Sequence, residues 1–285
     1  MIKVITDSTS YLEKQTVKDL DIEILSLKVE FQQDTYREVE LENKAFYRMM
    51  EERGIPKSSQ PAVGEFIEAF ESVVKEGNQV LGVFLSGKMS GTLSTAVMAK
   101  DMVVKDHPDA VIELMDSESN CMQLGFAAEA AAKAAKEGRS LQEVIQAVED
   151  MKKRSRFLFV PDSLKYLKAG GRIGKANALI GGLLSIIPIL TVENGETSIY
   201  KKVRRKKKAV NEMIEKLRAE HREHTVKEII IHHIDAFKEA EALAKRIQKE
   251  VEAPTRILDI GPVIGLHVGP GAIGIAYYTE KELRD

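Results

Sequence analysis

Apolar runs alternate with polar turns and amphipathic segments through the first 160 residues. Three short apolar runs, residues 2–7, 79–86 and 110–116, are each followed by a polar turn and a segment with helical periodicity. A further helical segment, LQEVIQAVEDMKKR, precedes the apolar run RFLFV. Strands that alternate with helices in this way predict a parallel sheet with helices on both faces.

Two helix starts in this part of the chain carry sequence signals. Ser10 and Glu13 have the spacing of a capping box, which predicts that a helix begins there. Pro61 fits near the first turn of a helix that includes EFIEAFESVV. Ser58 and Ser59 are then expected just before that helix, with their hydroxyls beside free backbone amides.

The pattern changes after about residue 160. The segment ILTVENGETSIYKKV predicts a hairpin with Asn194 and Gly195 at its turn, and predicted helices then alternate with the strands EIIIHHI and RILDIG. We predict an α/β fold of two domains. Residues 1–160 form a parallel-sheet domain with Rossmann-like layering, and residues 161–285 form an α+β domain with an antiparallel or mixed sheet.

The longest apolar run, residues 178–192, is shorter than the roughly 20 residues that a helix needs to span a bilayer. Gly181, Gly182 and Pro188 also interrupt it. We therefore predict that this run forms a buried wall.

The composition favours a soluble globular protein without a strong charge bias. Hydrophobic residues make up 44% of the chain and the formal net charge is -2, so there is no general attraction to nucleic acid or anionic membranes. A single cysteine, Cys121, cannot form an internal disulfide. The start MIKVITDSTS lacks the pattern of a secretory leader, and we expect a cytoplasmic protein.

The glycine-rich segment GPGAIG matches the spacing of a dinucleotide-binding fingerprint. Such a fingerprint opens a helix and is followed about 20 residues later by an acidic residue. Only residues 275–285 follow Gly274, and they begin with the strand-like IAYY. We therefore exclude a dinucleotide site, and the nearby His267 needs another explanation.

Four turns that bear hydroxyl groups follow strands or precede helices: DSTS (7–10), SSQP (58–61), SGKMSGT (86–92) and DSES (116–119). Ligands of a parallel sheet bind beyond the carboxyl ends of its strands, so we expect these turns to converge. Hydroxyls and helix amino termini together can bind an anion. Each turn alone is better explained by the preference of Ser, Thr and Asp for caps and turns, but four together favour a site.

The basic run KKVRRKKK, residues 201–208, leaves several interpretations open. It could form a nucleic-acid-binding or targeting patch, although it has no interleaved aromatic residues. A strand-to-helix junction with solvated lysines would look the same. One or two of its arginines could also pair with a phosphate or a carboxylate.

Four of the histidines lie in two pairs. His221 and His224 are three residues apart on a predicted helix, but no cysteine or carboxylate lies at a matching ligand spacing, so we expect no metal site. His232 and His233 are adjacent in a predicted strand and point to opposite sides of it. We expect both to be exposed or at the edge of the core.

Ser90, Asp116 and His267 could in principle form a hydrolytic triad, although GKMSGT does not match the G-x-S-x-G elbow. A serine esterase or thioesterase that uses Ser90 is therefore the enzymatic alternative. A nucleic-acid-binding regulator that uses residues 201–208 is another.

Taken together, these segments resemble the DegV family of bacterial fatty-acid-binding proteins, the FakB-type acyl carriers of the fatty acid kinase system. The resemblance covers the whole chain in order: VITDSTS, SSQPAVGEF, SGKMSGT, DSES, SLKYLKAGGRIGKANALIGGLL, PIL, KVRRKKKA and IGPVIGLHVGPGAIG. It implies a two-domain carrier that is not an enzyme and has no cofactor. One long-chain fatty acid, such as palmitate, stearate or oleate, is then expected between the domains.

The resemblance also implies roles for particular residues. The fatty acid carboxylate is expected at the hydroxyl turns, and the tail is expected to be buried. By motif, the expected ligand-binding residues are Ser58, Ser59, Ser90, Thr92, Arg172, Arg204 and His267. The last three are expected at the head-group end or at the acyl phosphate that a fatty acid kinase makes.

The implied partners are that kinase and an acyl-phosphate acyltransferase, with at most transient membrane contact. Two positions depart from the family pattern. Ser58 stands where a threonine is usual, which keeps the hydroxyl, and Ile187 stands where a lysine usually precedes Pro188. The second change removes a cation near the end of the expected groove.

Overall fold

The computed structural model describes residues 1–179 and 186–283, and the chain divides into two compact units. Unit 1 comprises residues 1–40 and 58–152, and unit 2 comprises residues 41–57 and 153–285. The domain boundary at residue 160 stays a prediction. By contacts, residues 153–160 and the inserted segment 41–57 group with unit 2.

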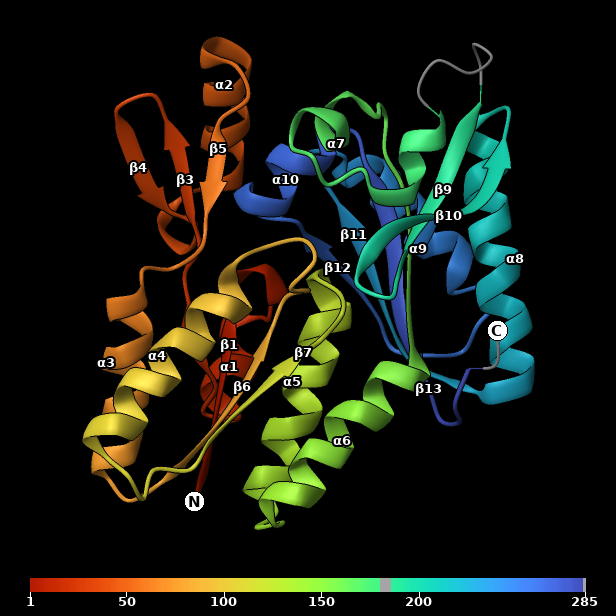
Figure 1. The fold of residues 1–285 in the computed structure, drawn as a ribbon. Helices are drawn as coiled ribbons and strands as arrows, with labels where there is room; N and C mark the ends of the chain where they lie inside the picture. Colours follow the sequence, from red (N-terminus) through yellow and green to blue (C-terminus); the bar gives the residue numbers. More distant parts are fainter. Residues whose placement is uncertain (180–185, 284–285) are drawn as a thin grey trace. The chain divides into compact units, whose positions relative to one another are not determined.

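The main sheet of unit 1 is parallel throughout, which confirms the expected architecture (Figure 1). Its strand order is β2 (Glu23–Leu25), β1 (Ile2–Asp7), β6 (Gln79–Phe84) and β7 (Ile112–Asp116). Each neighbouring pair is parallel. The carboxyl ends of all four strands therefore lie at one edge.

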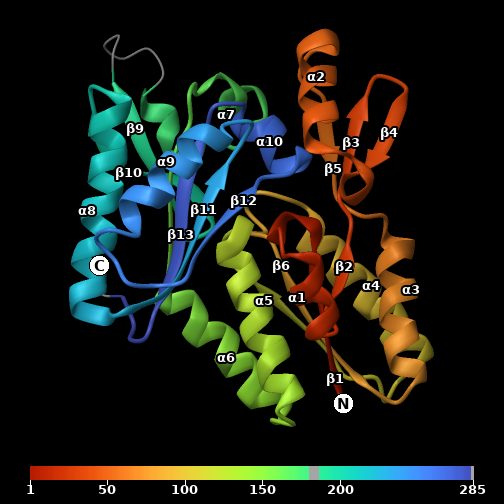
Figure 2. The same cartoon turned by 180° about the vertical axis from the view of Figure 1, so that it is seen from behind.

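Helices cover both faces of this sheet, as Figure 2 shows from behind. On one face, α3 (Val63–Lys75) and α4 (Thr92–Asp106) pack against the strands. The buried core there includes Ile5, Phe66, Ala69, Phe70, Val80, Phe84, Ala96, Ala99 and Ile112. On the other face, α5 (Cys121–Lys136) packs against β1, and α1 (Lys14–Asp19) and α6 (Leu141–Arg154) complete the helices of unit 1.

The helix predicted after Pro61 is confirmed as α3, but two details of the helix starts in this unit are wrong. A short 3-10 turn, Ser8–Ser10, follows β1, and α1 begins only at Lys14, so Ser10 does not cap it. Ser58 and Ser59 lie in the strand β5 (Lys57–Ser59) instead of beside helix amides. The amino end of α3 is capped by Glu65, whose carboxylate accepts a hydrogen bond from the Ala62 amide at 2.8 Å.

The strand β5 belongs to a small separate sheet in the order β4 (Asp34–Arg37), β3 (Lys28–Phe31) and β5. A 3-10 turn, Glu38–Glu40, follows β4, and the helix α2 (Asn43–Arg53) then precedes β5. Residues 41–57, which include α2, are counted with unit 2, so the chain enters unit 2 once before it completes unit 1.

The sheet of unit 2 is mixed, as expected. Its strand order is β10 (Glu196–Val203), β9 (Ile187–Glu193), β8 (Ser155–Val160), β13 (Ile273–Thr279), β11 (Val226–His233) and β12 (Thr255–Asp259). The β11–β12 pair is parallel and the other pairs are antiparallel. The predicted hairpin is confirmed, because β9 and β10 pair around Asn194 and Gly195, which both have positive φ.

The expectation that RFLFV joins the parallel sheet of the first domain is wrong. This segment is β8, which pairs antiparallel with β13 and β9 in unit 2. A run of buried residues predicts a strand but carries no information about the direction of its neighbours. One of those neighbours, β13, comes from the far end of the chain.

Helices α8 (Lys206–His224) and α9 (Phe237–Ile247) cover one face of this sheet. Unit 2 also contains α2, the shorter α7 (Lys165–Ala169), a 3-10 segment Gly174–Leu179 and α10 (Pro262–Val268). Of the apolar run 178–192, Pro188, Ile189 and Leu190 are buried in β9, whereas Gly181 and Gly182 lie outside the described residues. Within residues 1–179 and 186–283, no helix is both long and apolar enough to cross a bilayer.

A buried ionic cluster joins α8 to the sheet of unit 2. The carboxylate of Glu220 lies 2.9 Å from Arg156 Nε and 2.9 Å from Lys216 Nζ, and it accepts a hydrogen bond from the Tyr277 hydroxyl at 2.6 Å. Burial and the neighbouring Glu220 charge raise the pKa of Tyr277 well above its usual value. Such a cluster is stable only while every charge has its partner.

Replacement of Glu220 by Gln should therefore lower the free energy of unfolding by about 3 kcal/mol, because it leaves the Arg156 charge buried and uncompensated. Urea denaturation measures the change. Glu241→Gln is the matched control, since Glu241 pairs with Lys245 at 3.0 Å on the exposed face of α9. The free energy of unfolding of Glu241→Gln should stay within about 0.5 kcal/mol of the wild-type value. Equal decreases in the two variants would contradict this account.

Candidate functional site

The turns at the carboxyl edge of unit 1 are joined through a buried carboxylate. Asp7, at the end of β1, accepts hydrogen bonds from the Leu85 amide at 2.8 Å, the Thr9 amide at 3.0 Å and the Thr9 hydroxyl at 2.6 Å. Burial raises the pKa of Asp7 to about 6, although these hydrogen bonds act to lower it. Asp7 thus fixes the DSTS turn against the end of β6.

The DSES turn meets the SGKMSGT turn at the same edge. The Ser86 amide donates to the Ser119 carbonyl at 2.8 Å, and the Asp116 carboxylate accepts from the Gly87 amide at 3.1 Å and the Glu118 amide at 2.7 Å. The expected convergence of DSTS, SGKMSGT and DSES is therefore confirmed. The Asp116 carboxylate stabilises these turns by accepting backbone hydrogen bonds, which argues against its proposed role in a hydrolytic triad.

Ser90 and Thr92 form a pair of hydroxyls at the amino end of α4. Their side-chain oxygens lie 2.9 Å apart, and the Thr92 amide donates to Ser90 Oγ at 3.3 Å. Ser90 is half-buried and Thr92 is fully buried. Two hydroxyls and the amino terminus of a 15-residue helix can together bind an anion without a full counter-charge.

The SSQP turn reaches this pair through Gln60, a residue for which the sequence predicted no role. A Cβ on Gly91 would lie only 3.1 Å from Gln60 Nε2, so the amide of Gln60 packs on the backbone between Ser90 and Thr92. Gln60 Nε2 also donates to Thr95 Oγ1 at 3.4 Å. Nothing in the sequence around Gln60, which directly precedes Pro61, predicted this contact.

Ser58 and Ser59 point to opposite faces of the small sheet, because they are consecutive residues of a strand. Ser59 donates its hydroxyl to Glu30 on β3 at 2.6 Å, so these two side chains share a face. Ser58 therefore lies on the other face, which it shares with the buried Val29 and Phe31. Of these two serines, only Ser58 is on the apolar side of this sheet.

In unit 2, the structure brings Arg172 and His267 together around Gly170. The Arg172 guanidinium donates to the Gly170 carbonyl at 2.5 Å. The imidazole of His267 occupies the space that a Cβ on Gly170 would fill. The Gly-Gly pair in AGGRIGKA was the available sequence signal, because a side chain at residue 170 has no room.

His267 is neutral in this setting. Burial and the positive charge of Arg172 lower the pKa of His267 to about 4. A neutral imidazole beside a guanidinium can donate or accept a hydrogen bond at an anionic head group.

The other predicted cation of this unit, Arg204, is exposed just after β10, at the start of the basic junction with α8. In the described part of the chain it takes part in no hydrogen bond or ion pair, whereas the nearby Lys206 donates to Asp162 at 3.1 Å and to the Gly271 carbonyl at 2.9 Å. Residues 201–208 therefore form the strand-to-helix junction that was one of the interpretations.

The expectation that His232 and His233 are exposed or at the core edge is wrong. Both are buried in β11, and burial lowers the pKa of His232 to about 3. Each packs edge-on against a phenylalanine, Phe157 or Phe237. Among the residues that the structure describes, no group of three or more His, Cys, Asp or Glu could hold a metal ion.

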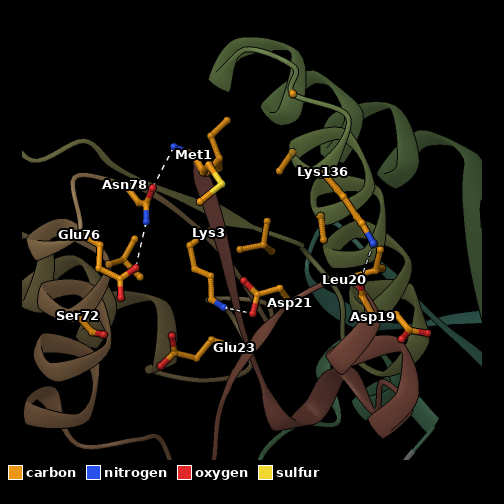
Figure 3. A pocket seen from close by; sticks show the side chains of 16 residues that line it. Met1, Lys3, Asp19, Leu20, Asp21, Glu23, Ser72, Glu76, Asn78 and Lys136 are labelled. Atoms are coloured by element: carbon orange, nitrogen blue, oxygen red, sulfur yellow. Dashed lines mark hydrogen bonds and ion pairs between the residues drawn. The ribbon is translucent and has the colours of Figure 1, made fainter.

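A cavity of about 670 Å³ opens at the opposite, amino edge of the sheet in unit 1 (Figure 3). Its wall carries the acidic residues Asp19, Asp21, Glu23 and Glu76. Lys3 is paired with Asp21 at 2.6 Å. None of the predicted site residues lines this cavity, and its acidic wall is unsuited to a carboxylate.

These features define a two-unit α/β protein with a hydroxyl-lined carboxyl edge in unit 1 and, in unit 2, a buried histidine beside a half-buried arginine. The family model described as uncharacterised protein, DegV family, matches residues 1–280. A DegV domain-containing protein of Clostridium acetobutylicum is 52% identical over 99% of each chain. Protein DegV of Bacillus subtilis is 36% identical over 97% of this chain and 98% of its own. The chain belongs to the DegV family.

Solved structures resemble the whole chain as well. A crystal structure of DegV from Bacillus subtilis, described as a fatty acid binding protein, is 34% identical with a TM-score of 0.88 and covers 98% of this chain and 99% of its own. A stearic acid-binding protein from Eubacterium ventriosum is 25% identical with a TM-score of 0.89 over the same shares. A protein of Thermotoga maritima whose structure revealed fatty acid binding is 30% identical with a TM-score of 0.81.

The buried neutral state of His267 should make the protein less stable in mild acid. Because its folded pKa is depressed, its contribution to stability is present above the unfolded pKa of about 6.5 and is lost as the pH falls towards about 4. From pH 7 to pH 5 the loss should be on the order of 2 kcal/mol. His267→Gln should remove this part of the pH dependence, measured by urea denaturation at both pH values.

Asp7 and His232 are unchanged in that variant, so their contributions cancel in the comparison. Asp7 acts in the opposite sense, since its raised pKa stabilises the fold at low pH and the effect is lost as the pH rises through about 6. An identical loss of stability in wild type and His267→Gln would show that His267 does not carry the effect.

Proposed function

We propose that this protein is a lipid carrier without enzymatic activity of its own, which binds one long-chain fatty acid. The observation that carries the proposal is the full-length likeness to fatty-acid-binding DegV structures, at 34% identity and a TM-score of 0.88 for the Bacillus subtilis protein. The hydroxyl turns of unit 1 supply polar groups of the kind that the carboxylate of such a ligand needs.

In this proposal the carboxylate binds at Ser58, Ser90 and Thr92. The Ser90–Thr92 pair already forms at the amino end of α4, and Ser58 faces the apolar side of its sheet. Ser59 is a poor candidate, because its hydroxyl is donated to Glu30, whose negative charge would repel a second carboxylate. The Ser59–Glu30 contact therefore supports Ser58 over Ser59, which the motif treated as a pair.

A cradle of hydroxyls suits a carboxylate that must later react. A bidentate arginine pair would hold the carboxylate more firmly and lower its reactivity as a nucleophile. The affinity comes instead from the tail. Burial of about 15 methylenes at about 0.8 kcal/mol each amounts to roughly 12 kcal/mol before entropy costs.

We further propose that the bound carboxylate is presented to a fatty acid kinase, which phosphorylates it to an acyl phosphate for an acyltransferase. Arg172 and His267 are the groups that could stabilise the added charge, since they lie together and the imidazole is neutral before the phosphate arrives. Arg204, exposed and free of ion pairs within the described residues, is available to the same anion or to the kinase.

Titration of delipidated protein with palmitate in a calorimeter tests the binding step. Ser58→Ala and Ser90→Ala should each weaken binding by about 10- to 100-fold, because each removes a hydrogen bond to a charged group worth roughly 1.5–3 kcal/mol. Ser59→Ala is the matched control and should bind within about threefold of wild type. Absence of palmitate or oleate uptake by wild type would overturn the proposed function.

The kinase step has a separate test. Acyl phosphate should form only when kinase, ATP and the fatty-acid-loaded protein are combined. A serine hydrolase would instead be labelled at Ser90 by a fluorophosphonate probe, and labelling that disappears in Ser90→Ala would replace the carrier proposal with the enzymatic alternative.

A further inference from the structure

An aromatic ring packs against α10, the helix that carries His267, at a position where the helix has a glycine. Tyr47 of α2 is buried, and its hydroxyl donates to the Ile260 carbonyl, just before α10, at 3.2 Å. A Cβ on Gly265 would overlap the same hydroxyl, so the phenol of Tyr47 rests directly on the backbone of α10. Asn43 adds a second hydrogen bond to the Ile260 carbonyl at 3.3 Å.

We propose that Tyr47 is a positioning residue for His267, which holds α10 so that the imidazole stays against Gly170 and beside Arg172. This role rests on the proposed function only in so far as His267 serves the head group.

The geometry of a helix places Tyr47 and Gly170 on opposite sides of α10. Gly265 and His267 are two residues apart, and two steps of about 100° each rotate the side chain by roughly 200°. Tyr47 contacts α10 at Gly265, and Gly170 receives the ring of His267. The helix is therefore held from both sides, and a gap at Tyr47 would let His267 move away from Arg172.

A seven-residue helix cannot fix its own position. Pro262–Val268 is too short to be stable in isolation, so its placement depends on packing. The contact with α2 supplies that packing from a segment more than 200 residues earlier in the chain. It accounts for the grouping of residues 41–57 with unit 2.

The experiment is an NMR pH titration of the His267 imidazole, assigned by its loss in His267→Asn. Tyr47→Phe removes the hydroxyl that touches Ile260 and Gly265. We expect a displaced His267 resonance, a pKa shifted by at least half a unit towards 6.5, and palmitate affinity lowered by about fivefold. Tyr277→Phe is the matched control, because its hydroxyl bonds Glu220, and it should leave the His267 resonance unchanged.

A second variant pair keeps the test independent of any single substitution. Gly265→Ala forces a Cβ into the Tyr47 hydroxyl and should displace the His267 resonance in the wild-type background. The displacement should be smaller when Tyr47→Phe is also present, since removal of the hydroxyl makes room for the methyl group.

An unchanged His267 resonance in Tyr47→Phe, or equal displacement in Tyr277→Phe, overturns the positioning role. Wild-type protein that takes up no palmitate overturns the proposed function instead, and the resonance of His267 still decides the role of Tyr47.

Discussion

The buried carboxylate of Asp7 sets the geometry on which the hydroxyl-lined edge depends. A carboxylate without water is tolerated only when donors surround it, and Asp7 has three. One donor is the Leu85 amide, directly before Ser86, so the end of β1 fixes where the SGKMSGT turn begins. The raised pKa of Asp7 shows that these donors offset the cost of burial only in part.

The corresponding constraint in unit 2 is the close packing of side-chain rings against the backbone of glycine residues. Gly170, Gly265 and Gly269 each leave no room for a Cβ, because His267, Tyr47 and Tyr166 occupy that space. Tight contact lets a short helix hold a functional side chain in one place. It also excludes water, and with Arg172 this keeps His267 uncharged.

The two units thus offer different kinds of groups to an anion. Unit 1 offers hydroxyls and a helix amino terminus, which bind an anion through dipoles, and unit 2 offers a guanidinium with a neutral imidazole. In the proposed function, the first set suits a carboxylate before phosphorylation and the second suits the larger charge afterwards. An anion near Arg172 would offset the charge that lowers the pKa of His267, so the imidazole could then take up a proton.

Local patterns were enough to predict most strands of the two larger sheets and the β9–β10 hairpin, but they did not predict β2 or the small sheet of β4, β3 and β5. The hairpin depends on Asn194 and Gly195, whose positive φ is a property of those residues themselves. Motif resemblance likewise placed Ser90, Thr92, Arg172 and His267 among the candidate residues. The structure then showed the contact between Ser90 and Thr92, and it showed that Arg172 and His267 both lie against Gly170.

What the sequence determined by itself was therefore which segments form elements and which residue types could meet an anion, because periodicity and turn chemistry act over a few residues. The tertiary structure alone decided the direction of β8, the burial of His232 and His233, the separation of Ser58 from Ser59, and the contact of Tyr47 with α10. These depend on partners elsewhere in the chain, up to more than 200 residues away for Tyr47, and no local pattern records which partner a buried strand or ring will meet.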